Sequence, residues 1–281
     1  KFMKKIIITV GPSSLNKDTI QKMEQAGVDI FRINMSHTPL ESFEKIVLQL
    51  QEWTSKTICL DTEGAQLRTG VLRGDGKLIL ENYERVKFIF GTEKEGEIKK
   101  IPLNINPKRI LKQGDLIKID FNSVVIQITE IFGEHIFGGV IVGGMIGTNK
   151  GVSVDRDIRM PAFSKKDVTV FKKANELGLK TIALSFASCG EDIVKLRSYF
   201  DYEIDVISKV ESKIALNNIE SICRESNAVL IDRGDLSRDV PLEKIIFAQQ
   251  FIIDRAKELH TPVYVATNLM ENMITNSKPT R

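Results

Sequence analysis

The residues best suited to chemistry are charged side chains that follow apolar, strand-like runs late in the chain. Lys209 and Glu211 are two positions apart in the segment Ser208-Lys209-Val210-Glu211, so an extended backbone places both on the same side. Burying such a pair is costly unless each charge has a partner. The spacing therefore predicts either a reactive site or a structural ion pair.

A second charged segment, residues 231–235, ends another apolar run. Gly234 lets the backbone approach a ligand closely, and Asp235 offers a carboxylate. Two carboxylates with waters suit Mg²⁺, which prefers oxygen ligands and leaves positions open for substrate oxygens. An Arg-Gly-Asp cell-adhesion tripeptide would instead need an exposed loop in a secreted protein. We therefore predict a divalent-metal site built from Glu211 and Asp235.

The elements that position these residues are apolar runs alternating with helical patterns. After the first run, Ile20, Met23 and Ala26 recur at helical spacing up to Gly27. Strands that alternate with helices predict a parallel sheet. The runs that predict strands are residues 6–10, 30–34, 57–60, 181–184, 206–208, 228–231 and 263–266.

The pattern changes between Val71 and Ile158, where short strand-like runs alternate with glycines and turns. We expect an α/β fold: a (β/α)8-type TIM barrel domain over residues 1–70 and 159–281, with a small all-β domain, residues 71–158, inserted after strand 3. Only seven barrel strands are predicted, so the barrel is expected to be incomplete at its C-terminal end. Either further chain or a strand from elsewhere would close it.

The bulk composition excludes several classes of protein. The 281 residues are 42% hydrophobic and 27% charged, which is typical of globular proteins. The 40 basic and 37 acidic residues are mixed along the chain, so the sequence has no basic cluster of the kind that binds nucleic acid. No apolar run is long enough to span a bilayer and the start is not a signal peptide, so a cytoplasmic location is expected. The three cysteines are widely spaced, with no CxxC pair, and predict core or incidental thiols.

Polar residues also follow other predicted strands, where barrel proteins place their functional groups. For Asn34, Ser36 and Thr62, the alternative to a functional role is a structural one, in which the side chain caps a strand end or forms a hydrogen bond within a turn. The polar residues at the ends of the second, third and seventh predicted strands are Arg32, Asn34, Ser36, His37, Asp61, Thr62, Thr267 and Asn268.

Eight segments resemble, in order, the signature sequences of the pyruvate kinase family. They are IIITVGPSS, FRINMSH, LDTEGAQLRTG, IALSF, VISKVES, DRGDLS, VYVATNLMENM and NSKPTR. The resemblance covers essentially the whole chain and is most specific where residues 207–211 combine with residues 233–237. It implies phosphoryl transfer between phosphoenolpyruvate and ADP, giving pyruvate and ATP, with residues 71–158 corresponding to the family's mobile lid.

The resemblance also implies roles for individual residues. Glu211 and Asp235 correspond to ligands of Mg²⁺ or Mn²⁺, and Lys209 to the lysine that stabilises the phosphoryl group in flight. The other implied roles are catalysis for Arg32 and Thr267; substrate binding for Gly234, Asp235, Thr267 and Ser185; nucleotide binding for Arg32, His37, Arg68 and Lys150; and K⁺ ligation for Asn34, Ser36, Asp61 and Thr62.

The chain departs from the family pattern mainly on the nucleotide side. Glu63, Ala65 and Gln66 replace the usual lysine, proline and glutamate, which bears on K⁺ dependence, and Asp232 before Arg-Gly-Asp is a further change. These departures keep open a divergent Mg²⁺-dependent enzyme of phosphoenolpyruvate or pyruvate with another acceptor or another enolate reaction.

A third possibility is a non-catalytic barrel that binds a metabolite or a protein. The family's chain continues beyond the match, so we also expect a homo-oligomer or a further C-terminal segment, with neither a nucleic acid nor a membrane as partner.

Overall fold

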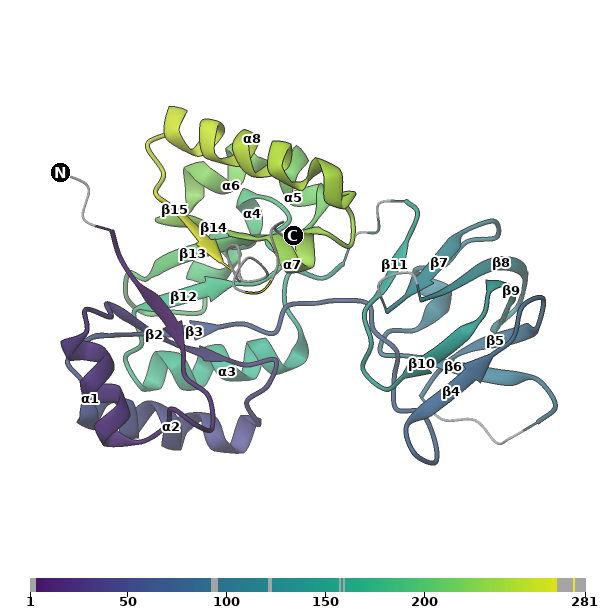
Figure 1. Ribbon diagram of the computed structural model, residues 1–281, viewed down its shortest axis with the longest axis horizontal. Helices are drawn as coiled ribbons and strands as arrows, with labels where there is room; N and C mark the ends of the chain where they lie inside the picture. The colour runs from purple at the N-terminus through teal and green to yellow at the C-terminus, as the bar shows by residue number, and fades with distance from the viewer. Residues whose placement is uncertain are drawn as a thin grey trace. The chain divides into compact units, whose positions relative to one another are not determined.

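The computed structural model describes residues 4–91, 96–120, 123–156, 158, 160–266 and 275. Contacts divide the chain into two compact units, residues 1–65 with 161–281 and residues 66–160 (Figure 1). The sequence placed the corresponding boundaries at 70/71 and 158/159. Whether the second unit acts as a separate inserted domain stays a prediction.

The first unit is built on a parallel seven-stranded sheet with the order β1-β2-β3-β12-β13-β14-β15. Figure 1 shows these strands as a curved sheet with helices on its outer side. The strands are β1 (Ile7–Thr9), β2 (Ile30–Asn34), β3 (Thr57–Asp61), β12 (Thr181–Leu184), β13 (Asp205–Val210), β14 (Ala228–Asp232) and β15 (Val263–Ala266). The helices are α1 (Lys17–Gln25), α2 (Leu40–Trp53), α3 (Lys165–Glu176), α4 (Gly190–Arg197), α5 (Lys213–Asn217), α6 (Ile219–Glu225), α7 (Arg233–Leu236) and α8 (Ile245–Glu258), with the 3₁₀ turn η2 (Leu242–Lys244).

Apolar residues on both faces of this sheet hold it in place. Leu60 and Ile231 belong to the large core beneath the helices, whereas Cys59 and Leu230, their neighbours in the chain, belong to a second, smaller cluster. Alternate residues of one strand therefore pack on opposite faces, as expected for a parallel sheet. Cys59 is a free thiol, and burial raises its pKa to about 12, so it is a core residue.

Local sequence also fixes where helices begin. In α3, Ser164 accepts the backbone N–H of Asp167, and the Asp167 carboxylate accepts the N–H of Ser164. This reciprocal pair is a capping box, which satisfies two N–H groups that a helix start leaves free. It places Asp167, which is 1% exposed, close to the loop after β3.

The second unit contains two sheets. A six-stranded sheet has the order β11-β7-β8-β9-β5-β6, and β10 pairs with β4 in a two-stranded sheet. The elements are β4 (Lys77–Leu80), β5 (Arg85–Phe90), β6 (Lys99–Leu103), η1 (Pro107–Arg109), β7 (Leu116–Ile119), β8 (Val124–Phe132), β9 (His135–Val142), β10 (Gly144–Gly147) and β11 (Val152–Val154). Buried residues such as Phe88, Ile117 and Ile126 give this unit its own core.

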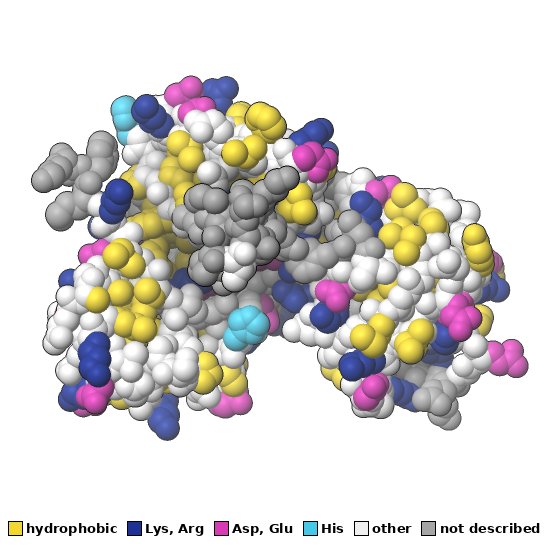
Figure 2. Space-filling model, in the orientation of Figure 1, with side chains coloured by type: hydrophobic (Ala, Val, Ile, Leu, Met, Phe, Trp, Pro, Cys, Tyr) yellow, Lys and Arg dark blue, Asp and Glu magenta, His cyan; other side chains and the backbone are white. Residues whose placement is uncertain are grey.

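The parallel α/β sheet expected from the alternating pattern is confirmed, whereas closure into an eight-stranded barrel stays a prediction. Basic and acidic side chains are mixed over the visible face of each unit, in line with the mixed charge of the sequence (Figure 2). Within the described residues, no helix combines the length and apolar character needed to cross a membrane.

Candidate functional site

The C-terminal ends of four neighbouring strands surround one buried lysine. Lys209 Nζ lies 2.8 Å from Glu211 Oε1, 3.4 Å from Asp61 Oδ1 and 3.9 Å from Asp232 Oδ2. It also donates to Ser185 Oγ at 3.1 Å. These partners come from β3, the turn after β12, the end of β13 and β14, so the strand order of the sheet assembles the site.

Asp61 connects Lys209 to a second cation. The Asp61 carboxylate is 1% exposed, and its other oxygen lies 3.5 Å from Arg32 Nη1. Arg32 is fixed in turn by its Nε, which donates to Thr9 Oγ1 at 2.8 Å. Two cations therefore flank one carboxylate at the ends of β1, β2 and β3, which is a suitable arrangement for receiving a further anion.

Ser185 joins the β12 turn to the loop after β3. Its N–H donates to Thr62 Oγ1 at 2.8 Å, and its hydroxyl lies 2.7 Å from the Thr62 carbonyl and 3.2 Å from Asp61 Oδ1. The hydroxyl has one proton and can donate to only one of these oxygens at a time. All three side chains are buried, so this network holds Lys209 in one position.

The electrostatics of the lysine and glutamate differ. Burial alone would lower the pKa of Lys209, but Glu211 and Asp61 outweigh it and raise that pKa above its usual range. Burial raises the pKa of Glu211 to about 7, with Lys209 opposing the shift and Asp235 and Asp232 adding to it. The lysine is therefore a cation at neutral pH, whereas the glutamate titrates near neutrality. A further cation bound beside the glutamate would lower its pKa.

The remaining carboxylates lie at the short helix α7. Asp232 is its N-cap and accepts the Gly234 N–H at 3.2 Å, while Asp235 pairs with Arg238 at 2.8 Å. One carboxylate oxygen each of Glu211, Asp232 and Asp235 lies within 4.8 Å of the others. The donors are all hard oxygens, which suits Mg²⁺ or Mn²⁺.

Phe186 is a site residue that the sequence did not reveal. Its φ of 54° lies in the left-handed region, which is strained for an aromatic residue. In this conformation its N–H donates to Glu211 Oε2 at 2.7 Å. The signature IALSF pointed to this segment, but its backbone conformation has no signal in the residue types.

The loop after β3 is held against α3 by another unpredicted residue. The Asp167 carboxylate accepts the N–H groups of Glu63 and Gly64 at 2.8 and 3.0 Å. Gly64 has a φ of +74°, and a Cβ there would come within 2.8 Å of the Phe186 ring. The loop that follows Asp61 therefore depends on a glycine at this position.

We expect Gly64→Ala to lower the free energy of unfolding by about 2–4 kcal/mol, from left-handed strain and overlap with Phe186. Gly178→Ala is the matched control, because its φ is +70° and a Cβ there meets nothing within 4 Å. The control should cost only about 1 kcal/mol. Urea unfolding of both variants measures the difference, and equal losses would show that the Phe186 contact is unimportant.

The residues assigned to K⁺ have identifiable protein partners. Asn34 Oδ1 accepts the Ser36 N–H at 2.9 Å, and Thr62 Oγ1 accepts the N–H of Ser185. Asp61 is already paired with Arg32 and Lys209. These contacts match the turn and strand-end roles that the sequence left open, and K⁺ ligation stays a prediction.

The residues assigned to the nucleotide are divided between the two units. Arg32 and the exposed His37 belong to the first unit. Arg68 and Lys150 belong to the second, where Arg68 donates to the Asn149 carbonyl and Lys150 Nζ pairs with Asp120 at 3.1 Å. Thr267 and Asn268 lie outside the described residues.

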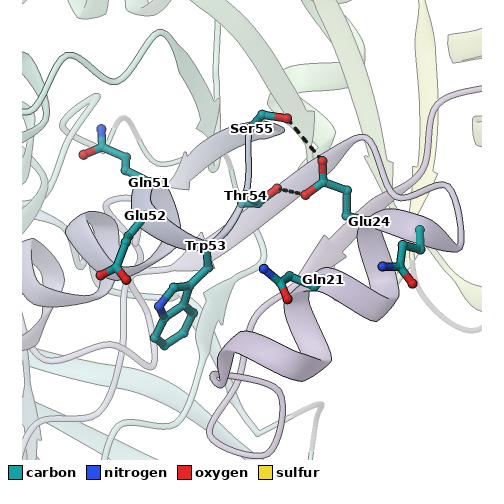
Figure 3. Close-up of a pocket in the computed structure, with 8 residues that line it drawn as sticks. Gln21, Glu24, Gln51, Glu52, Trp53, Thr54 and Ser55 are labelled. Atoms are coloured by element: carbon teal, nitrogen blue, oxygen red, sulfur yellow. Dashed lines mark hydrogen bonds between the residues drawn. The ribbon is translucent and has the colours of Figure 1, made fainter.

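A surface groove lies at the opposite end of the strands. Glu24 of α1 accepts hydrogen bonds from Thr54 Oγ1 at 2.5 Å and Ser55 Oγ at 3.2 Å (Figure 3). Thr54 and Ser55 precede β3, whereas Asp61 ends it. These two hydrogen bonds therefore connect α1 to the turn between α2 and β3. The lining residues of the groove are Gln21, Glu24, Gln25, Gln51, Glu52, Trp53, Thr54 and Ser55.

TIM-barrel proteins place their functional residues at the C-terminal ends of parallel strands, and the lysine and carboxylates of this sheet lie at that edge. The sequence model "Pyruvate kinase, barrel domain" matches residues 3–281. The chain belongs to the pyruvate kinase family.

Curated relatives agree with this assignment. The pyruvate kinases of Corynebacterium efficiens and Thermotoga maritima are each 33% identical, covering 99% of this chain and 60% and 61% of their own lengths. A pyruvate kinase of Rattus norvegicus is 29% identical over 98% of this chain and 52% of its own length. The chain thus spans about 60% or less of these relatives' lengths.

Proposed function

We propose that this chain catalyses the pyruvate kinase reaction, in which a phosphoryl group passes from phosphoenolpyruvate to ADP, giving pyruvate and ATP. The observation that carries the proposal is the buried Lys209, held among Asp61, Ser185 and Glu211 at the strand ends. Phosphoryl transfer depends mainly on positioning and on neutralising spread negative charge. A permanent buried cation with an adjacent oxygen cluster is suited to that task.

Glu211 and Asp235 are the proposed ligands of Mg²⁺ or Mn²⁺. The residues fit such an ion, because their donors are hard carboxylate oxygens and one oxygen of Glu211 lies within 4.8 Å of one of Asp235. When bound, the ion supplies positive charge to substrate oxygens and to the enolate that phosphoryl transfer leaves behind. K⁺ is a second proposed cofactor, at Asn34, Ser36, Asp61 and Thr62.

The protein's own groups have separate tasks. Lys209 and Arg32 neutralise the phosphoryl group as it moves, and Ser185 holds Lys209 in place. Thr267 is assigned to protonation of the enolate. The N–H groups of Gly234 and Asp235 are assigned to the substrate carboxylate, although the Gly234 N–H already donates to Asp232. Substrate binding there requires Asp232 to release that N–H.

The second unit is the proposed inserted lid, with Arg68 and Lys150 as its contacts to nucleotide phosphates. The proposed partners are small molecules, and the proposed location is the cytoplasm. Deleting residues 71–158 would test the lid role, which predicts folded protein that binds Mn²⁺ but has lost its affinity for ADP.

A coupled assay for pyruvate tests the proposed reaction. With phosphoenolpyruvate, Mg²⁺ and ADP, the protein should form pyruvate in proportion to ATP, and omission of ADP should abolish it. Pyruvate formed only with another acceptor would favour the divergent enzyme, which Glu63 and Gln66 support by altering charge on the nucleotide side. No pyruvate with any acceptor would overturn both versions.

The affinity of this site for metal should depend on pH. Because a carboxylate must lose its proton to bind a cation, protonation of Glu211 competes with Mn²⁺. With a pKa of about 7, Glu211 is mostly protonated below that pH. We expect Mn²⁺ to bind about tenfold more weakly at about pH 6 than at about pH 8. Calorimetric titration at both pH values measures this, and an unchanged Kd would contradict the raised pKa.

A further inference from the structure

Asp232 is a third carboxylate beside the two that the family resemblance assigns to the metal. It ends β14, and it is one of the positions at which the chain departs from the family pattern. Asp232 and Asp235 are three positions apart across the first turn of α7, so their side chains lie on the same side. One oxygen of each aspartate and one of Glu211 lie within 4.8 Å of one another.

The two oxygens of Asp232 have different surroundings. Oδ1 accepts the Gly234 N–H at 3.2 Å, which is the usual role of an aspartate at a helix N-cap. Oδ2 lies 3.9 Å from Lys209 Nζ, too far for a hydrogen bond. Capping therefore accounts for one oxygen and leaves the other directed at the charged cluster.

The three carboxylates of this cluster, Glu211, Asp232 and Asp235, lie beside the cations Lys209 and Arg238. Lys209 faces Glu211 and Asp232, and Arg238 faces Asp235. Glu211 Oε1 is buried and lies 2.8 Å from the Lys209 ammonium. Three close carboxylates repel one another unless a cation lies between them, so the site favours an added positive charge.

We propose that Asp232 is a third carboxylate of the divalent-cation site and gives the substrate-free protein its affinity for that cation. This inference rests on the proposed function, because it assumes the ion held by Glu211 and Asp235. In the substrate-free protein, Asp232 would offer Oδ2 to the ion while Oδ1 keeps the cap of α7. Affinity for hard cations rises with the number of charged ligands. The ion can then bind before phosphoenolpyruvate supplies its own oxygens.

The test is Mn²⁺ binding without substrate, followed by electron paramagnetic resonance of free Mn²⁺ and by calorimetry. Asp232→Asn is the informative variant, because asparagine also caps helices and keeps an acceptor for the Gly234 N–H. We expect its Kd for Mn²⁺ to be about 10- to 100-fold weaker than that of the wild type. Asp254→Asn removes an equal charge from the exposed face of α8 and should change Kd by less than about twofold.

The outcomes separate this inference from the function beneath it. Wild-type affinity in Asp232→Asn, with weakened binding in Asp235→Asn, would overturn the inference and leave Asp232 as a cap alone. No Mn²⁺ binding by the wild type would overturn the proposed metal site as well. Asp232→Ser is a second capping variant in case asparagine perturbs folding, and it should show the same weakening with unchanged thermal unfolding.

Discussion

Replacing Lys209 with methionine is expected to lower kcat for pyruvate formation about a thousandfold, because the proposed reaction loses the buried cation that would neutralise the moving phosphoryl group. KM for phosphoenolpyruvate should change much less, since the main loss is in the transition state. Lys173→Met is the matched control. Lys173 forms a surface pair with Glu44 at 3.6 Å and should keep nearly full activity when replaced.

The same change should also destabilise the fold, and the two effects can be separated. Removing Lys209 leaves Asp61 and Glu211 buried without their shared cation, at a cost of about 3–5 kcal/mol. Adding Glu211→Gln removes one of these charges, so the double variant should recover stability but no activity. Glu211 is also a proposed metal ligand, so activity is compared in the single variant, and full kcat in folded Lys209→Met protein would show that Lys209 is only a structural partner.

Replacing Glu211 with glutamine is expected to weaken Mn²⁺ binding at least about 100-fold, because a direct charged ligand is lost while the size of the side chain is kept. The amide oxygen can still accept the Phe186 N–H, so the strained turn after β12 should survive. Pyruvate formation at limiting Mg²⁺ should fall in parallel and recover partly at high Mg²⁺.

Calorimetry with Mn²⁺ measures this effect, and Glu220→Gln is its control. Glu220 is an exposed residue of α6, and its Oε1 lies 4.0 Å from Arg255 Nη1. It is not one of the buried carboxylates at the strand ends. Its replacement should leave Kd unchanged within about twofold. Equal Kd values for Glu211→Gln and the wild type would place the cation on other residues.

The alternating pattern of the chain was enough to predict much of the site. Lys209 and Glu211 were expected on one side of a strand from their spacing, and they lie 2.8 Å apart. Asp61 follows an apolar run, which placed it at a strand end because parallel strands share one C-terminal edge, whereas Ser185 was implied only by the family resemblance. Periodicity along each strand and the shared edge of the sheet are properties of local sequence, so they could be predicted.

Contacts that depend on backbone shape or on partners distant in sequence were missed. Phe186 takes a left-handed conformation that its residue type disfavours, and Asp167 reaches Gly64 across 103 positions of sequence. Asp232 was noticed as a polar residue at a strand end and as a departure from the family pattern, but not as a metal ligand. Its spacing from Asp235 carried a signal, but the signal required knowing that a helical turn begins at Arg233.

The most direct test of the central claim is a crystal structure of the protein with Mn²⁺ and oxalate, a mimic of the pyruvate enolate. The anomalous signal of Mn²⁺ locates the ion independently of the surrounding side chains. We predict one ion on the carboxylates of Glu211 and Asp235, with an oxygen of Asp232 beside it and Lys209 facing the oxalate. An ion bound elsewhere, with these carboxylates still paired only to Lys209 and Arg238, would contradict the account.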